Sequence, residues 1–406
     1  MFRYYNNKQE SKTVKAKLAL IATALLTSTA ALAITPSEHA LTLAKDTIIV
    51  DGHIDVPYRI NDQWEDVSKA TDGGDFDYPR AVKGGLNAPF MSIYIPASYE
   101  ASGGSVLLAN KLIDSMEALV GRAPDKFALA HSVADVEKAF AEGKIALPMG
   151  MENGTPIEGS LDNLRHFYER GIRYITLAHS QANHISDSSY DLRRKWNGLS
   201  DFGKKLVVEM NNIGIMVDIS HVSDDAFYQA VEISKAPMIA SHSSIRQFTP
   251  GFERNMNDDM IKKLAENGGV IMINFGSSFV SKQARQWNDQ FSNKMEEKDL
   301  SWSDPNAESF SKQYRQNNPY PYASLKLVLD HIDHVRDLVG IEHIGIGSDY
   351  DGVGDSLPQN LKDVSTYPNL VQGLLDRGYS DADIRKILSG NLLRVWREVE
   401  AYAATH

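Results

Sequence analysis

The sequence predicts an α/β fold, a parallel (β/α)8 barrel, from three observations. Eight short apolar or β-branched runs occur along the 406-residue chain. Amphipathic stretches separate most of them, which is the alternation expected when helices connect parallel strands. Ionisable side chains stand at the same end of six of the runs, where a barrel of this class gathers its active site. A doubly wound open sheet is the alternative, and the placement of the polar residues favours the barrel.

The predicted strands are runs of eight to ten residues. In chain order they are 47–56, 88–95, 145–152, 172–179, 214–221, 236–243, 268–275 and 343–350. The predicted helices between them include "LDNLRHFYERG", "DFGKKLVVEMNNIG", "SDDAFYQAVEIS" and "NDDMIKKLAENG". In the last of these, Asn257 is the expected N-cap and Gly268 lies just past the expected C-terminus.

One region departs from the regular alternation. Residues 277–322, between the seventh and eighth predicted strands, are polar and aromatic and are long for a connection of this kind. We expect a long loop insertion that opens on the catalytic face of the barrel. A lid, a subunit contact and a merely solvated excursion all fit its composition.

The N-terminus has the layout of a secretory signal peptide. A basic stretch precedes a 16-residue apolar run, residues 18–33, which closes with Ala31-Leu32-Ala33. A transmembrane anchor is the alternative, but it needs about 20 apolar residues and lacks such a cleavage site. We therefore predict a signal peptide at 1–33, export to the periplasm or the exterior, a single domain at 34–406, and no membrane span after cleavage.

Charge and cysteine content narrow the possible partners. Without residues 1–33 the chain would keep 37 basic and 52 acidic side chains, a formal net charge of −15. This acidity argues against nucleic acid or anionic lipid as a partner. Because the chain has no cysteine, an exported fold would depend on its core and on bound metal rather than on disulfides.

Side chains of metal-ligand type end several predicted strands. His53 and Asp55 are two residues apart on the first strand, so both can point into the barrel mouth. Glu152 ends the third strand, and His221 and His242 end the fifth and sixth. Three imidazoles and two carboxylates suit Zn²⁺ or a similar divalent ion, and burying them without a cation would be costly. Five donors fit two ions if Glu152 bridges; a single-metal site and a set of structural histidines are the alternatives.

Three further residues are predicted to take part in a reaction at this site. Asp349 ends the eighth strand, next to the first, and can act as base and then acid toward a water bridging two ions. Arg254 follows the sixth strand and can clamp a substrate carboxylate or pair with nearby acids. His179 ends the fourth strand and can polarise a substrate carbonyl or serve as another ligand. Asp351 is expected only to support or cap its loop.

Nine segments of the chain together resemble one known family. They are "VDGHIDVP", "GMENG", "YITLAHS", "VDISHVS", "PMIASHSS", "RNMNDDMI", "GIGSDYDGV", "DVSTYPNLVQGLL" and "NLLRVWREVE". In this order they resemble the renal or membrane dipeptidases, peptidase family M19, over residues 45–400. The resemblance implies a TIM barrel of the metal-dependent amidohydrolase type, two zinc ions and a homodimer. It also implies hydrolysis of dipeptides, often with a D-residue at the C-terminal position, and in some members opening of carbapenem-type β-lactams.

The resemblance also implies roles for eight residues, all of which are intact. They match ligands of one zinc (His53, Asp55), the bridging carboxylate (Glu152), ligands of the other zinc (His221, His242), the catalytic acid/base (Asp349), the substrate-polarising histidine (His179) and the arginine that binds the substrate's C-terminal carboxylate (Arg254). Departures from the family pattern lie elsewhere. Gly276 follows "MINF" where some members have a tyrosine, "GMENGTPI" lacks a histidine found in others, and 277–322 is longer than in the mammalian enzyme. These departures concern side-chain preference.

Two rival functions share parts of this pattern. A related amidohydrolase, such as a deaminase or an enzyme acting on N-acyl amino acids or β-lactams, usually carries an HxH pair on the first strand, and HxD stands here. A non-catalytic periplasmic peptide-binding protein would have no use for Asp349 beside a full ligand set. The sequence therefore favours a zinc-dependent dipeptidase, and it leaves the preferred dipeptide, the physiological metal and the oligomeric state open.

Overall fold

Eight parallel strands close into a barrel in the computed structural model, which describes residues 34–301 and 304–406. Around the barrel the strands follow the order β1, β10, β9, β8, β7, β6, β5 and β2. Their bounds are β1 (Val50–Ile54), β2 (Ala88–Tyr94), β5 (Met149–Glu152), β6 (Ile172–Thr176), β7 (Met216–Asp218), β8 (Ile239–Ser243), β9 (Val270–Ile273) and β10 (Ile344–Ile346). Each lies within one predicted run, so the predicted (β/α)8 barrel is confirmed. The predicted signal peptide lies outside the described residues.

The third predicted strand, 145–152, is in fact two strands. Pro148 separates β4 (Ile145–Leu147) from β5, because proline has no N–H to give to a sheet ladder. Its carbonyl accepts a hydrogen bond from the backbone N–H of Met91 at 2.8 Å. β4 pairs in parallel with β3 (Phe127–Leu129), a strand outside the barrel that the sequence analysis did not predict. Only β5 therefore carries its side chains to the barrel mouth.

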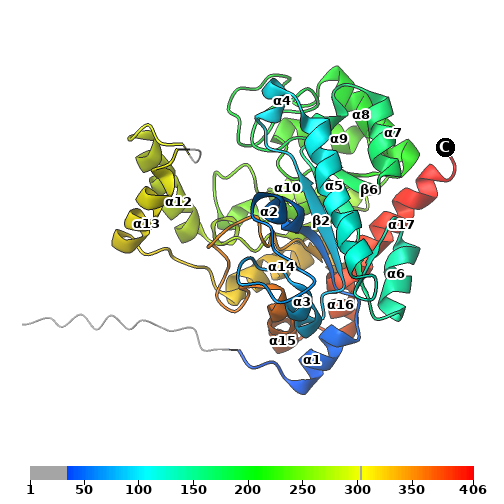
Figure 1. Cartoon of the computed structure of the whole chain (residues 1–406), viewed down its shortest axis with the longest axis vertical. Helices are drawn as coiled ribbons and strands as arrows, with labels where there is room; N and C mark the ends of the chain where they lie inside the picture. The colour runs from blue at the N-terminus through cyan, green and yellow to red at the C-terminus, as the bar shows by residue number, and fades with distance from the viewer. Residues whose placement is uncertain (1–33, 302–303) are drawn as a thin grey trace, which may run out of the picture. The chain divides into compact units, whose positions relative to one another are not determined.

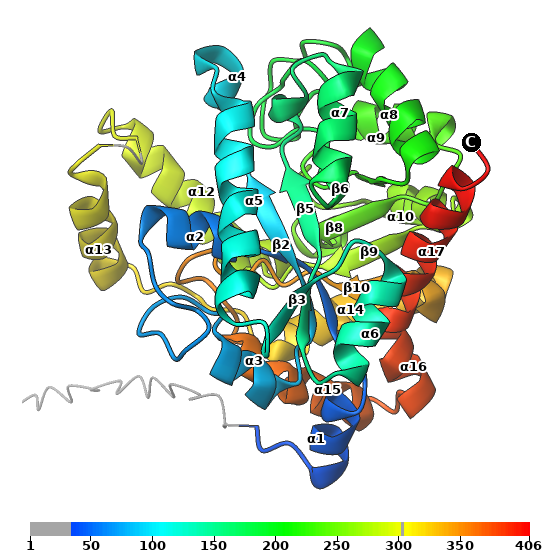
Figure 2. The ribbon, with the colours of Figure 1, turned by 45° about the vertical axis from the view of Figure 1, so that its right-hand side comes forward.

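Helices surround the barrel (Figures 1 and 2). They are α1 (Glu38–Lys45), α2 (Val56–Asp62), α3 (Tyr78–Gly84), α4 (Tyr99–Ser102), α5 (Ser105–Arg122), α6 (Val133–Ala141), α7 (Leu161–Glu169), α8 (Asp201–Ile213), α9 (Asp224–Ile233), α10 (Asp258–Glu266), α14 (Leu325–Val339), α15 (Tyr367–Asp376), α16 (Asp381–Arg385) and α17 (Asn391–Ala403). The side chain of Asn257 caps α10 by accepting from Met260 N–H at 2.9 Å, and Gly268 follows with φ +84°, as predicted. Among the described residues, no helix combines the length and apolar character needed to cross a membrane.

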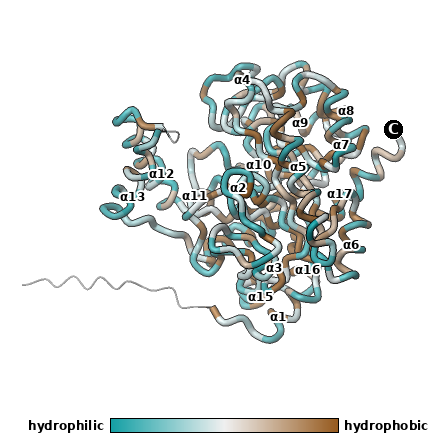
Figure 3. Tube along the Cα trace, viewed as in Figure 1, coloured by the Kyte–Doolittle hydropathy of each residue, from teal (hydrophilic) through white to brown (hydrophobic). Residues whose placement is uncertain are grey.

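Residues 277–322, which we call the lobe, form helices rather than the long loop predicted. They contain α11 (Ser277–Val280), α12 (Lys282–Glu296) and α13 (Ala307–Asn317). The buried residues of α12 recur every three or four positions, which is helical spacing: Ala284, Trp287, Phe291 and Met295. They pack with Ala307 and Tyr320 in a small apolar cluster separate from the main core. The lobe stands at one side of the barrel in both ribbon views, and its helices are largely hydrophilic in Figure 3.

Three aromatic side chains pack against one another in a buried apolar cluster that also contains aliphatic residues of the barrel strands. Trp396 of α17 packs on Phe90 of β2 with ring centroids 5.3 Å apart, and Phe90 packs on Tyr174 of β6 at 5.2 Å. Tyr174 is fully buried, and its ring lies over Gly150, the residue opposite it on the neighbouring strand β5. A Cβ on Gly150 would lie 2.0 Å from Tyr174 Cζ. Glycine at this position is therefore required for the tyrosine to occupy the barrel interior.

This packing predicts that Gly150→Ala destabilises the fold. The added methyl group would collide with the Tyr174 ring, and overpacking of this kind costs about 1–3 kcal/mol. Denaturant unfolding followed by circular dichroism measures the loss. Gly121→Ala is the matched control, because Gly121 lies in α5 with no atom within 4 Å of the new Cβ. Unfolding of Gly150→Ala at the wild-type denaturant concentration would contradict the packing argument.

Candidate active site

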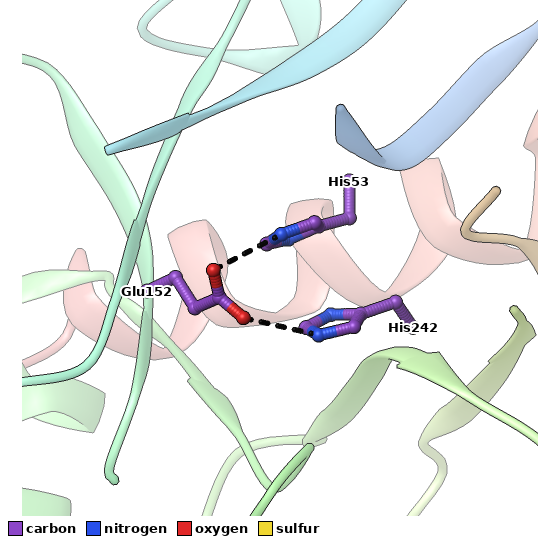
Figure 4. A group of neighbouring side chains, drawn as sticks. All are labelled: His53, Glu152 and His242. Carbon is purple, nitrogen blue, oxygen red and sulfur yellow. Dashed lines mark ion pairs between the residues drawn. The ribbon is translucent and has the colours of Figure 1, made fainter. Parts of the chain in front are cut away.

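The predicted site residues meet at one end of the barrel. Because the strands are parallel, residues at or just beyond their C-terminal ends share the same mouth. The residues that meet there are His53, Asp55, Glu152, His179, His221, His242 and Asp349, and donor atoms from three trios of them lie within 4.8 Å of one another. Figure 4 shows one trio, with the Glu152 carboxylate on one side and the stacked imidazoles of His53 and His242 on the other, their ring centroids 3.8 Å apart.

Glu152 is the centre of this arrangement, and its two oxygens face different partners. Oε2 lies 3.4 Å from Nε2 of His53. Oε1 lies 3.1 Å from Nε2 of His221 and 3.2 Å from Nε2 of His242. Nε2 of His179 is 3.6 Å from the same oxygen. One carboxylate therefore faces four imidazoles, which come from β1, from β8 and from the segments just after β6 and β7.

The carboxylates of Asp55 and Asp349 lie beside His53. Oδ2 of Asp55 is 3.5 Å from Nε2 of His53. A Cβ on Gly352 would fall 2.2 Å from Oδ2 of Asp55 and 2.3 Å from Oδ1 of Asp349, so both oxygens converge on the space above this glycine. A larger residue at position 352 could not be accommodated without moving one of the two carboxylates.

The donor set fits divalent cations. Nε2 of His53 and Oδ1 of Asp55 are buried and have no hydrogen-bond partner, which is unfavourable for polar atoms unless a ligand satisfies them. Nε2 of His221 and Nε2 of His242 are only 2.8 Å apart and both point at Glu152. Imidazole nitrogens and carboxylate oxygens gathered in this way are typical ligands of zinc and related metals. The individual ligand assignments remain predictions.

Burial governs the protonation of these groups. Burial lowers the pKa of His221 and of His242 well below the usual range for histidine, so both imidazoles are neutral. Burial alone would raise the pKa of Glu152, but His53 and His179 outweigh it and hold that pKa well below its usual value. Burial alone would lower the pKa of His53, but Tyr174, Glu152 and Asp55 hold it well above the usual range for histidine. A bound cation would favour a neutral imidazole there and an ionised carboxylate, which are the forms that bind metal.

Asp349 is buried, and one of its two carboxylate oxygens accepts a hydrogen bond from Asn274. Burial raises the pKa of its carboxyl group to about 7, and the carboxylates of Asp55 and Glu152 act in the same direction. His53 and a hydrogen bond from Asn274 act against this rise. Nδ2 of Asn274 donates to Oδ2 of Asp349 at 2.7 Å, which leaves Oδ1 facing Asp55. A bound cation would favour the ionised form of Asp349.

Arg254 is buried behind the imidazoles. Its Nη1 donates to Oγ of Ser243 at 2.7 Å and its Nη2 to the carbonyl of His242 at 2.8 Å. Its Nε is buried without a hydrogen-bond partner. The alternative to a substrate clamp, a pairing of Arg254 with nearby acids, is not found, because no ion pair connects Arg254 to a carboxylate among the described residues.

Asp351 does not face the metal-ligand cluster. Its Oδ1 accepts from the N–H of Asp75, its own N–H donates to Oδ2 of Asp75 at 2.8 Å, and Nε of Arg59 lies 3.4 Å from its Oδ2. These contacts join its loop to the segment before α3. They agree with the loop-supporting role expected from the sequence.

The structure adds residues that the sequence analysis missed. Asn274, which holds Asp349, follows β9 directly, so the search for polar strand ends would have found it. The ring of Tyr94 meets the His179 ring edge-on at 4.8 Å. Tyr174 and Ser241 contact His53 and His242 from inside the barrel, and nothing in the spacing of the sequence indicates those contacts.

A cavity of about 970 Å³ opens over the cluster. Its floor includes Asp55, Glu152, His179, His221 and Asp349. Its outer wall includes side chains of the lobe: Arg285, Trp287, Asn288, Phe291, Ser292, Ser311 and Arg315. The barrel thus provides the side chains of metal-ligand type, and the lobe encloses part of the space above them.

Curated proteins similar to this chain are dipeptidases. Mouse dipeptidase 3 is 33% identical over 372 residues, which cover 89% of this chain and 66% of the mouse protein. Dipeptidase tcpJ of Claviceps purpurea is 34% identical over 370 residues, covering 87% of this chain and 78% of the fungal protein. The chain thus spans about two thirds of the mouse relative's length.

Solved structures share the fold over almost their entire length. The probable dipeptidase PvdM of Pseudomonas aeruginosa superposes with a TM-score of 0.76 at 27% identity, covering 90% of this chain and 98% of that one. A metallo peptidase of Rhodobacter sphaeroides, liganded with a phosphinate mimic of the dipeptide L-Ala-D-Ala, gives 0.72 at 25% identity, covering 87% and 100%.

The family itself is identified by a match along nearly the whole described chain. The family model described as membrane dipeptidase (peptidase family M19) matches residues 37–406. The resemblance seen in the nine sequence segments is thereby confirmed, as is the expectation of a hydrolase of the metallopeptidase type. This chain belongs to peptidase family M19, the membrane dipeptidase family.

Proposed function

We propose that the protein is a dipeptidase that uses two divalent cations, most simply zinc. The observation that carries the proposal is the orientation of Glu152. Its Oε2 faces His53, which neighbours Asp55, and its Oε1 faces His221 and His242. The two oxygens thus have different nearest donors, which is the arrangement expected of a bridging carboxylate. A single-ion site would leave one of the two groups without a cation.

Cations bound there would supply the Lewis acidity that activates a water and stabilises charge on the attacked carbonyl oxygen. Asp349 takes a proton from the attacking water and returns it to the leaving amine, for which its Oδ1 is free while Asn274 holds Oδ2. His179, partly exposed on the cavity floor, donates to the carbonyl of the scissile bond. Arg254 is buried beside His242 and does not line the cavity as it stands, so it would have to turn toward the cavity to bind the substrate's C-terminal carboxylate with its unpartnered Nε.

A dipeptide is the substrate class that these groups fit best. A buried guanidinium beside His242 and a general acid beside His53 would suit a substrate with a free carboxylate one residue beyond the scissile bond. The curated relatives are named dipeptidases, and the Rhodobacter relative holds a mimic of L-Ala-D-Ala, which supports tolerance of a D-residue at the C-terminal position. Export through a cleaved segment at 1–33 and a homodimer stay predictions.

The first prediction is that dipeptide hydrolysis depends on about two divalent ions per chain. The two donor groups around Glu152 motivate it. Elemental analysis of the purified protein gives the metal content, and release of free amino acids from L,L and L,D dipeptides gives the rate before and after chelation and after zinc is returned. Turnover of N-acyl amino acids without dipeptides would indicate a related amidohydrolase. Binding without product would indicate a peptide-binding protein.

The second prediction is that Arg254→Ala abolishes the preference for a free C-terminal carboxylate. Removing one partner of a buried charged contact costs about 2–5 kcal/mol, so kcat/KM for dipeptides should fall at least about tenfold. Because Arg254 also supports Ser243 and His242, the measurement is the ratio of kcat/KM for a dipeptide to that for its C-terminal amide. General damage to the site would lower both rates and leave the ratio unchanged. A wild-type enzyme that cleaves both at equal rates would contradict the role.

The third prediction separates proton transfer from metal binding. Asp349→Asn keeps the shape of the side chain but cannot carry the proton, so kcat should fall by roughly 10²- to 10⁴-fold while metal content stays near wild type. Glu152→Gln should lose metal, since it weakens the bridge between the two donor groups. Asp351→Asn is the control, a buried carboxylate two residues away that faces Asp75 and Arg59 instead, and it should keep most of kcat. Loss of metal from Asp349→Asn would make Asp349 a ligand.

A further inference from the structure

His53 makes a hydrogen bond that determines where its ring proton lies. Nδ1 of His53 is 2.8 Å from the hydroxyl of Tyr174, and that hydroxyl is 3.0 Å from the carbonyl of Gly52. A carbonyl can only accept, so the single proton of the phenol goes to Gly52. The phenol oxygen must then accept from Nδ1–H of His53. In the neutral imidazole this leaves the lone pair on Nε2, the atom that faces Glu152.

His242 is held in the same way by a different pair of residues. Its Nδ1 is 2.7 Å from Oγ of Ser241, and that hydroxyl is 2.7 Å from Oδ2 of Asp218. Oδ1 of Asp218 accepts from the backbone N–H groups of Ser220 and Ser241, at 3.0 and 2.8 Å. A carboxylate that accepts on both oxygens takes the serine proton. Ser241 must therefore accept from Nδ1–H of His242, and Nε2 again keeps its lone pair.

Both hydroxyls are inaccessible to substrate. Tyr174 and Ser241 are fully buried, and neither lines the cavity above the cluster. Tyr174 reaches His53 from β6 across the barrel interior, over the space that Gly150 leaves free. Ser241 lies on β8 directly before His242. Any effect of these two side chains on the site must therefore pass through the imidazoles.

We propose that Tyr174 and Ser241 are positioning residues that fix His53 and His242 as the Nδ1–H tautomer, with Nε2 directed at a bound cation. The inference rests on the proposed metal site and assigns each positioning residue to one of its two donor groups. Tyr174 acts on the donor group of His53 and Asp55, and Ser241 acts on the donor group of His221 and His242. Removing such a partner of a ligating histidine typically weakens metal affinity about 10- to 100-fold.

The test measures zinc affinity rather than turnover. Metal-stripped wild type, Tyr174→Phe, Ser241→Ala and the double variant are titrated with zinc against a chromophoric chelator, and melting temperatures are recorded with and without metal. Each single variant should bind one ion about 10- to 100-fold more weakly and keep the other near wild-type affinity, while the double variant loses affinity for both. Phenylalanine keeps the ring that packs over Gly150, so the metal-free melting temperature of Tyr174→Phe should change little.

Two matched controls remove a buried or half-buried hydroxyl elsewhere. Tyr379→Phe loses a hydrogen bond to Asp333, and Ser234→Ala loses hydrogen bonds to Asn211 and Ala236. Both should bind zinc as the wild type does. Wild-type affinities in Tyr174→Phe and Ser241→Ala would overturn the inference, as would equal losses from one and the same ion. A wild-type protein that binds no zinc would instead overturn the proposed metal site itself.

Discussion

The rest of the active site depends on the buried carboxylate of Glu152. An ionised carboxylate that loses its hydration costs several kcal/mol unless nearby groups compensate. Here the compensation comes from imidazoles on strands that are far apart in the sequence, with nitrogen atoms 3.1 to 3.6 Å from its oxygens. The barrel has to be closed for these contacts to exist, because Glu152 ends β5 while His53 comes from β1 and His242 from β8, two strands that do not neighbour β5 in the barrel. The site is therefore complete only when the barrel is closed.

Positioning these groups requires unfavourable backbone conformations at the strand ends. Asn153, His221 and Asp349 all have left-handed backbones, with φ of +76°, +69° and +64°. Such conformations cost of order 1–3 kcal/mol each for non-glycine residues and persist only where the surroundings impose them. The surroundings do so through hydrogen bonds: Asn153 donates from Nδ2 to the carbonyl of Ile95, and Asp349 donates from its backbone N–H to the carbonyl of His53. The side chains of His221 and Asp349 line the cavity, whereas that of Asn153 bonds to Ile95, Thr155 and Asn183.

How much could be predicted from the sequence depended on whether the signal was local. The barrel strands are apolar runs, and the ionisable groups sit at their ends, so both were predictable from residue type and position. Pro148 divides a run that looks like one continuous strand in the sequence. The polar composition of the lobe hides the apolar residues at every third or fourth position of α12, such as Ala284, Trp287 and Phe291. The hydrogen bond between Tyr174 and His53 joins residues 121 positions apart on strands that do not pair. Only the closed barrel brings them together, so no local pattern could reveal it.

The barrel and the lobe contribute different kinds of recognition. Every dipeptide has the same amide, amine and carboxylate, and the groups proposed to act on these atoms, His179, Arg254 and Asp349, all come from the barrel. What differs between dipeptides is the side chains, and the part of the cavity farthest from Glu152 is walled by the lobe. Because the lobe has its own apolar cluster, its surface can vary without repacking the strands that hold the ionisable groups. Under the proposed function, the chemistry would belong to the barrel and the side-chain preference to the lobe, whose α12 and α13 pack in an apolar cluster of their own.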